Sequence, residues 1–199
     1  MFAYIKGELA QTEGDFVVID VNGIGYKVYM PISTMEKLGE LGSIVKVHTY
    51  YYVREDNISI YGFRTKEELK MFELLQAVSG IGAKSANVIL STVEPSAFAL
   101  AIITNDTSGL TKIPGIGAKT AARMILELKD KLKKTEAISN MDDKISTIIK
   151  IDGKVDEAIS ALKVLGYNLK QIEEAILKIE TEELELEDII RKALSVLGR

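Results

Sequence analysis

Residues 110–125 read LTKIPGIGAKTAARMI, and residues 75–90 have already read LQAVSGIGAKSANVIL. Both stretches contain the pentapeptide GIGAK, and in both it lies between two apolar runs with helical spacing. A repeat this short and this well kept predicts one structural device that the chain uses twice.

Two enzymatic interpretations of the repeat fail on spacing. A P-loop places four residues between its first glycine and a Gly-Lys-Ser/Thr end, whereas Ala83 separates Gly82 from Lys84. A dinucleotide fingerprint needs a third glycine and a preceding strand, but Ser85 and Thr120 occupy that position and helices are expected before both copies. The repeat therefore predicts neither an ATP site nor a dinucleotide site.

The remaining interpretation is a helix, a tight glycine turn and a second helix. Glycines let the backbone turn closely, and open N–H groups at a helix start can bind a phosphate oxygen. Ile81 and Ile116, between the glycines, are expected to point into the core. This is the helix-hairpin-helix form, which holds DNA by its backbone; the alternative is a compact turn without a ligand. The predicted DNA-binding residues are Gly80, Gly82, Lys84, Ser85, Gly115, Gly117, Lys119, Thr120 and Arg123.

Regional charge supports the phosphate interpretation, although the whole chain has a net charge of −4. Residues 1–63 carry five Lys/Arg and eight Asp/Glu, a net −3; residues 64–134 carry eleven and seven, a net +4; residues 135–199 carry nine and fourteen, a net −5. Both GIGAK copies lie in the basic region, with Lys112 and Lys129 nearby.

The pattern along the chain predicts a multidomain α and β protein. Residues 1–63 alternate short Val-, Ile- and Tyr-rich runs with glycine turns, which predicts five strands in an OB-type barrel and a short helix near residues 34–38. Residues 64–134 become helical after a capping box, Thr65 with Glu68, and are expected to hold both hairpins. Residues 135–154 are expected to be a flexible linker, and residues 155–199 a UBA-like three-helix bundle with a helix capped by Asn168.

Composition removes several kinds of chemistry. The chain has no cysteine and one histidine, His48, which excludes disulfides, thiolate metal sites, a histidine-based zinc site and a Ser-His triad within one chain. No cofactor and no metal are expected. No segment approaches the ~20 apolar residues that span a bilayer, so we expect a cytoplasmic protein.

Across its whole length the chain resembles the RuvA family, the DNA-junction-binding subunits of bacterial RuvAB branch migration complexes. The residues that carry the resemblance are GIGYKV at 23–28, YVREDNISIYGF at 52–63, both GIGAK copies and ALKVLGY at 161–167. The resemblance implies a homotetramer, and on DNA an octamer of two tetramers, that holds a Holliday junction open and flat. It also implies that the chain catalyses nothing itself, that it recruits the RuvB ATPase, and that the RuvC resolvase is a further partner.

The resemblance also assigns roles outside the hairpins. Glu55 and Asp56, between two expected strands, correspond to an acidic pin at the junction centre that keeps strands apart, because carboxylates repel phosphates. From the residues alone they are an ordinary polar turn. Leu162, Leu165 and Tyr167 correspond to the family's motor-binding surface; the alternative is that they form only the core of the small domain.

Other aromatic residues keep two interpretations. His48 lies in an alternating strand and is expected to be structural. Tyr50, Tyr51 and Tyr52 are candidates for a base-stacking platform on a barrel, but alternation places some of them in the core.

Two other classes of protein compete with a junction scaffold. A structure-selective nuclease needs clustered carboxylates that hold Mg²⁺, and the acidic pairs Glu55/Asp56 and Asp142/Asp143 lack partners in the sequence pattern. A pure interaction adaptor needs only the C-terminal helices, which leaves the basic hairpins unexplained.

Overall fold

The computed structural model describes residues 2–55, 57–139, 153–181 and 184–198, and for residues 130–139 it describes the backbone only. Their contacts divide the chain into two compact units. The first comprises Met1–Gln76 and Ile81–Glu94, and the second comprises Ala77–Gly80 and Pro95–Arg199.

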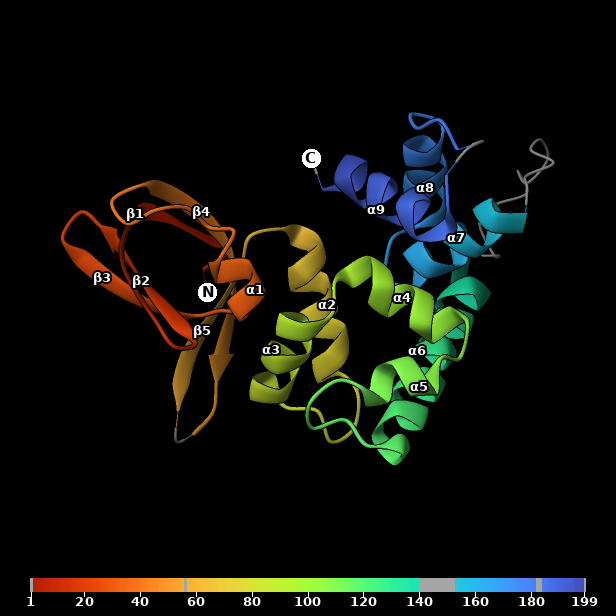
Figure 1. Ribbon diagram of the computed structural model, residues 1–199, viewed down its shortest axis with the longest axis horizontal. Coiled ribbons are helices and arrows are strands. Elements are labelled where there is room, and N and C mark those ends of the chain that lie inside the picture. The colour runs from red at the N-terminus through yellow and green to blue at the C-terminus, as the bar shows by residue number, and fades with distance from the viewer. Residues whose placement is uncertain (1, 56, 140–152, 182–183, 199) are drawn as a thin grey trace. The chain divides into compact units, whose positions relative to one another are not determined.

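Five strands in the first unit close into a barrel: β1 (Tyr4–Glu13), β2 (Phe16–Val21), β3 (Ile24–Tyr29), β4 (Ile44–Val53) and β5 (Ile58–Phe63). Their order around the barrel is β1-β2-β3-β5-β4, and β4 closes it against β1 (Figure 1). All pairs are antiparallel except β3 with β5, which is parallel and pairs only Val28 with Ile60 and Tyr29 with Tyr61. The expected five-stranded barrel is confirmed.

Alternation along the strands fills the barrel with apolar side chains. Inward residues of β1, β2 and β4 are buried while their neighbours face solvent, as a period of two requires. The turn between β2 and β3 is closed by Asn22 (φ 54°) and Gly23 (φ 86°), the Asn-Gly pair that hairpins favour. The core cluster comprises Ile5, Leu9, Val17, Ile19, Val28, Met30, Met35, Val45 and Val47.

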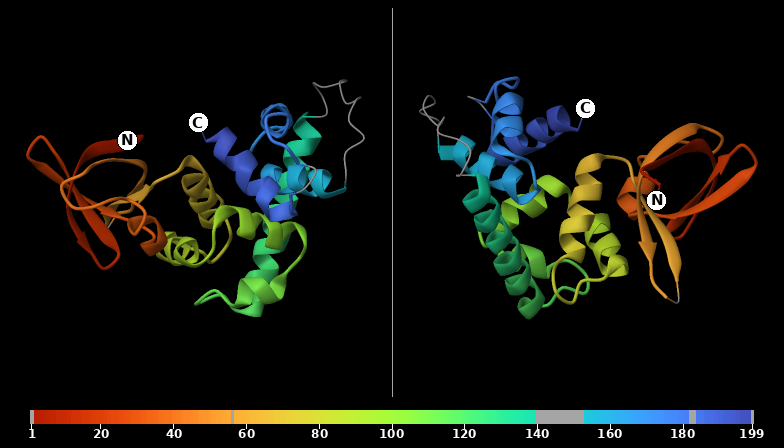
Figure 2. Two further views of the ribbon diagram at one scale, coloured as in Figure 1. Left: turned by 45° about the horizontal axis from the view of Figure 1, so that its top comes forward. Right: turned by 180° about the vertical axis from the view of Figure 1, so that it is seen from behind.

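Strands β4 and β5 form a hairpin that continues past the other strands (Figures 1 and 2). Their register runs from His48 opposite Phe63 to Val53 opposite Ile58. Beyond it, the Arg54 N–H donates to the Asn57 carbonyl at 2.8 Å, which extends the pairing of the two strands by one residue on each side.

Helix α2 (Lys66–Gln76) begins with the predicted capping box and packs on β4 and β5. The Glu68 N–H donates to Thr65 Oγ1 at 3.2 Å, and the Thr65 N–H donates to Glu68 Oε2 at 3.1 Å. Phe72 is fully buried and contacts the rings of Tyr50, Tyr61 and Phe63 at centroid distances of 5.3, 5.0 and 4.8 Å. This aromatic cluster anchors α2 to the barrel.

Helix α1 (Ile32–Met35) starts two residues before the helix expected near residues 34–38, because Pro31 supplies the fixed φ (−58°) of a helix start. It docks on α3 (Ala83–Thr92) through polar contacts. Buried Asn87 donates from Nδ2 to the Met30 carbonyl at 3.1 Å, and Ser91 Oγ accepts from the Ile32 N–H at 3.0 Å. These bonds fix α3 to the edge of the barrel.

The second unit contains α4 (Pro95–Ile103), α5 (Thr107–Thr111) and α6 (Ala118–Ser139). Asp106 caps α5 by accepting from the Gly109 N–H. Helix α6 continues to Ser139, so residues 135–139 of the expected linker are helical, since KKTEAIS contains neither glycine nor proline to stop a helix. The rest of that stretch up to residue 152, including ISTIIKI, lies outside the described residues.

The C-terminal residues form three helices: α7 (Gly153–Val164), α8 (Leu169–Ile176) and α9 (Leu186–Leu197). Helix α8 starts with a capping box in which Asn168 Oδ1 accepts from the Gln171 N–H at 2.9 Å, as the sequence predicted. The three helices bury a shared apolar core, and the expected three-helix fold is confirmed.

No single helix in the described ranges is long and apolar enough to cross a membrane; only the broken pair formed by α3 and α4 meets that criterion by length and composition.

Candidate nucleic-acid interface

The two GIGAK copies have the same backbone geometry. Gly80 has φ +89° and Gly115 has φ +82°, a region that residues with a side chain rarely adopt. Ile81 is 5% exposed and Ile116 is 7% exposed, so both isoleucines lie in the core as predicted. The first glycine of each copy is therefore required by the turn itself.

The second glycine of each copy is not required by the fold. Gly82 precedes α3 with φ −91°, which any residue adopts, and a Cβ at Gly82 or Gly117 has no atom within 4 Å. Each is exposed, and its carbonyl accepts the first bond of the following helix, from Ala86 and Ala121, at 2.9 Å. A glycine that the protein does not need for space or for φ leaves the N–H groups of the helix start open to a ligand.

The lysines and hydroxyls of the repeat lie in the first turn of each following helix. Lys84 and Lys119 are exposed, and within the described part of the chain neither has a hydrogen-bond or ion-pair partner. Ser85 is exposed and Thr120 is half-buried. Each copy thus combines the N–H groups of a helix start with the ammonium group of an exposed lysine. Both kinds of donor bind phosphate.

Arg123 is placed differently from the lysines. It is on α6, and its Nη1 donates to the Ser79 carbonyl at 3.2 Å, in the turn before Gly80. On the same helix, Glu127 Oε2 accepts from the Ser79 N–H at 3.0 Å. Sequence reasoning placed Arg123 in the site but missed Glu127 and Ser79, because no local pattern links residues this far apart.

Lys129, predicted from charge to be near the DNA, is bound within the protein. Its Nζ donates to the Ile103 carbonyl at 3.0 Å and to Asn105 Oδ1 at 2.8 Å, so it closes the end of α4. Lys112 follows α5 and is exposed, in keeping with a surface charge.

The structure describes one residue of the acidic pair that was predicted to form the pin. Glu55 is exposed at the turn between β4 and β5, whereas Asp56 lies outside the described residues, as do Asp142 and Asp143. In the residues that the structure covers, no group of three or more His, Asp or Glu side chains is placed to hold a metal ion.

The tyrosines of β4 have ring partners inside the chain. Tyr50 meets Phe72, Tyr51 meets Phe2 at 5.7 Å, and Tyr52 meets Tyr61 at 6.0 Å, all edge to face. His48 is half-buried, and burial, followed by nearby Lys46 and Lys66, lowers its pKa. The ring contacts give the three tyrosines a structural role in the barrel, and the backbone of His48 pairs with Tyr4 and Phe63.

Leu162, Leu165 and Tyr167 lie in the core of the C-terminal helices, at 0, 0 and 6% exposure. All three side chains are buried in the chain on its own, which supports the alternative interpretation that they form the core of the small domain. An amphipathic pattern marks them as apolar but does not distinguish a core position from a binding surface. Among the described residues of the C-terminal helices, the exposed large apolar residue is Leu177, at 73%.

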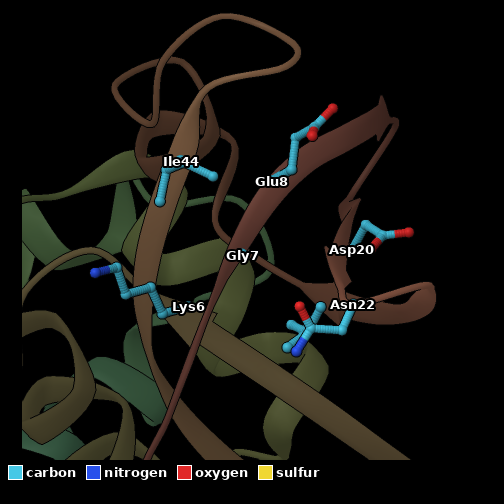
Figure 3. A pocket seen from close by; sticks show the side chains of 7 residues that line it. Lys6, Gly7, Glu8, Asp20, Asn22 and Ile44 are labelled. Carbon is cyan, nitrogen blue, oxygen red and sulfur yellow. The ribbon is translucent and has the colours of Figure 1, made fainter.

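The surface of the barrel has a hollow of about 440 Å³, which is far in sequence from both GIGAK copies. Lys6, Gly7 and Glu8 of β1 line one side, and Asp20 and Asn22 line the other (Figure 3). Glu8 and Asp20 both point outward from the strands, and Lys6 points to the other side (Figure 3), so the two carboxylates at this hollow do not suit a phosphate.

Comparisons with known proteins agree with this geometry. Three family models match in succession: "RuvA N terminal domain" over residues 1–62, "SAM-like Helix-hairpin-helix tandem" over 72–130 and "RuvA, C-terminal domain" over 153–198.

Similar proteins match over essentially their full lengths. One from Acetivibrio thermocellus is 47% identical and covers 100% of each chain. One from Ruminiclostridium cellulolyticum is 44% identical over 99% of this chain and 100% of its own, and one from Clostridium botulinum is 43% identical over 99% of each. All three carry the name Holliday junction branch migration complex subunit RuvA. With a barrel, a hairpin pair and a C-terminal helical domain each matched in order, this chain belongs to the RuvA family.

Proposed function

We propose that this chain binds four-way DNA junctions through its two glycine turns and serves as a non-catalytic subunit of a branch migration complex. The observation that carries the proposal is the second glycine of each turn, Gly82 and Gly117, which the fold leaves open and does not require. The names of the similar proteins supply the substrate, a Holliday junction, and the complex.

Phosphate binding would use both copies in the same way. N–H groups at the starts of α3 and α6 face the DNA backbone, and Lys84 and Lys119 neutralise the phosphates they approach. Such contacts fix the position of the DNA without reading its sequence. The proposed DNA-binding set comprises Gly80, Gly82, Lys84, Ser85, Gly115, Gly117, Lys119, Thr120 and Arg123.

The other parts of the chain receive complementary roles. Residues 1–63 provide the barrel and an acidic pin at Glu55 and Asp56, on a hairpin that projects from the barrel (Figure 2). Residues 64–134 bind DNA, the segment at 135–154 connects the domains, and residues 155–199 bind a RuvB-type ATPase. Because Leu162, Leu165 and Tyr167 are buried, they support that binding surface from beneath or become exposed when the partner binds.

The proposed assembly is a homotetramer in the cytoplasm, which forms an octamer when two tetramers enclose one junction; a RuvC-type resolvase is a further proposed partner. Four copies around a four-way junction give each arm one pair of glycine turns.

The decisive experiment incubates the protein with a labelled four-way junction and a matched linear duplex, with and without Mg²⁺. We expect tighter binding of the junction than of the duplex, and no cleavage of either. The Lys84→Ala and Lys119→Ala double variant should bind both DNAs more weakly and lose about two units of salt slope for each DNA arm that one pair of turns binds, since each phosphate contact contributes about 0.9. Mg²⁺-dependent cleavage, or equal affinity for junction and duplex, would refute the proposal.

A further inference from the structure

Both main-chain polar groups of Ser79 are bound by side chains of α6. The Ser79 N–H donates to Glu127 Oε2 at 3.0 Å, and the Ser79 carbonyl accepts from Arg123 Nη1 at 3.2 Å. Ser79 immediately precedes Gly80, the residue with φ +89° that makes the first glycine turn. The helix that follows the second turn therefore holds the start of the first one.

The geometry makes this a two-point attachment. Arg123 and Glu127 are four residues apart, so they lie on the same face of α6. A Cβ at Gly80 would be 3.8 Å from Arg123 Nη1, so the guanidinium lies against the turn. By its contacts, Ala77–Gly80 belongs to the compact unit that contains α6, although the helices on either side of these four residues, α2 and α3, belong to the other unit.

Glu127 places a negative charge next to the proposed phosphate site. A carboxylate within the basic region, bound to the turn beside a proposed phosphate site, repels the ligand of that site. Electrostatics alone would favour a neutral residue or a cation there. Glu127 is half-buried and accepts the Ser79 N–H, which a neutral apolar residue cannot do.

We propose that Arg123 and Glu127 are positioning residues: they hold Ser79, and with it the start of the first glycine turn, in the conformation that binds phosphate. This inference rests on the proposed function. Arg123, a member of the proposed DNA-binding set, thereby acts on DNA through Ser79 and not by contacting a phosphate. Preorganisation raises affinity because the turn need not be ordered when DNA binds, and a linked second site multiplies the affinity of the first.

Two substitutions of one residue separate position from charge. Glu127→Gln and Glu127→Ala both remove the negative charge, but only Gln keeps an oxygen that accepts the Ser79 N–H. We expect Glu127→Gln to bind duplex and junction as tightly as wild type or more tightly. Glu127→Ala should bind about two- to tenfold more weakly than Glu127→Gln, the range that one hydrogen bond of ordinary strength supplies. Equal affinities of the two variants would overturn the proposal.

A second measurement locates the effect at the first turn. In a Glu127→Ala background, Lys84→Ala should cost less affinity than in wild type, because the first turn then contributes less. Lys119→Ala should cost the same in both backgrounds, since the second turn is unaffected. Arg123→Ala should weaken binding with an unchanged salt slope, and Arg123→Lys should restore part of the loss. A loss of about 0.9 in slope for Arg123→Ala would instead show a direct phosphate contact.

Amide hydrogen exchange in the DNA-free protein tests the attachment independently of function. The Ser79 amide should exchange faster in Glu127→Ala but not in Glu127→Gln, and both variants should still unfold well above the assay temperature. If Lys84→Ala and Lys119→Ala do not weaken DNA binding in the wild-type background, the proposed function fails. If they do and Glu127→Ala matches Glu127→Gln, only the positioning inference fails.

Discussion

At the scale of single residues, the two glycines of each turn have different roles. Gly80 and Gly115 are held at positive φ, so any side chain there strains the turn. Gly82 and Gly117 have ordinary space around them and lie directly before a helix. Their lack of a side chain therefore benefits a ligand and not the fold.

This division predicts opposite signs for stability and binding. Gly82→Ser and Gly117→Ser should leave the melting temperature unchanged or slightly raised, because serine is a favoured residue at a helix start. The new hydroxyl should bond the same N–H groups that the phosphate uses, so DNA affinity should fall by roughly tenfold or more, the cost of about 1.4 kcal/mol.

The matched control is Gly153→Ser at the start of α7, where a Cβ also has no atom within 4 Å. It adds the same side chain outside the hairpins and should change neither DNA affinity nor salt slope. Unchanged DNA affinity in Gly82→Ser would remove the first turn from the proposed site.

At the scale of elements, α3 is both a DNA-facing helix in the proposal and a structural partner of the barrel. Lys84 and Ser85 are on its exposed side, whereas Asn87 is 7% exposed and donates to the carbonyl of Met30. One helix thus carries the ligand site on one face and its attachment to α1 on another.

The hydrogen bond from Asn87 to Met30 predicts that replacing the Asn87 amide by a carboxyl group lowers the unfolding free energy by an amount that depends on pH. Asn87→Asp replaces the buried donor by a carboxylate beside the Met30 carbonyl, which should cost about 2–4 kcal/mol of unfolding free energy at neutral pH. Burial should raise the pKa of the new carboxyl above its unfolded value of about 3.9. The loss should therefore shrink as pH falls toward 4, where the protonated carboxyl donates to the carbonyl again.

Denaturant titration at pH 7 and pH 4 measures this change. Val88→Asp, on the same helix at a side chain that is 45% exposed, is the control and should cost less than about 0.5 kcal/mol. A loss of similar size in both variants would show that the bond from Asn87 to Met30 contributes little.

At the scale of the whole molecule, the proposed assembly gives the acidic hairpin a role that a single chain lacks. Four copies would bring four β4–β5 tips together, and Glu55 is exposed at the tip. Phosphates and carboxylates repel each other over about 8–10 Å at physiological salt. The pin would therefore exclude duplex from the centre.

Removing that charge should change selectivity more than affinity. The Glu55→Gln and Asp56→Asn double variant should bind a junction as tightly as wild type or more tightly, and its preference for junction over duplex should fall. Dissociation constants for both DNAs at one salt concentration measure this, with tetramer formation checked by light scattering. Weaker junction binding by an intact tetramer would show that these residues attract DNA, and the pin assignment would be wrong.

Local rules made much of this fold predictable. The Thr65/Glu68 capping box, the Asn168 cap and the buried Ile81 and Ile116 follow from patterns within a few residues, and the structure confirms each. The attachment of Ser79 was not predictable, because hydrogen bonds between residues 44 and 48 positions apart leave no periodic trace in one sequence.

The burial of Leu162 and Leu165 was open for a related reason. Hydrophobicity gives the same signal for a core and for a binding surface, and only the packing of α7, which contacts α4, α8 and α9, decides between them. The polar composition of residues 135–139 does not show that α6 continues through them, because Thr, Glu and Ser occur both in linkers and in helices and no glycine or proline marks the end of the helix.

The attachment of Ser79 also sets an order of events during synthesis. Its two partners are on α6, and Glu127 is 48 residues further along the chain. At roughly 5–20 residues per second, a ribosome adds that segment in about 2–10 s. For those seconds the first glycine turn has α2 before it but not the helix that holds it, so its Ser79 peptide groups must bond to water. The first hairpin to be made is therefore completed only after the second.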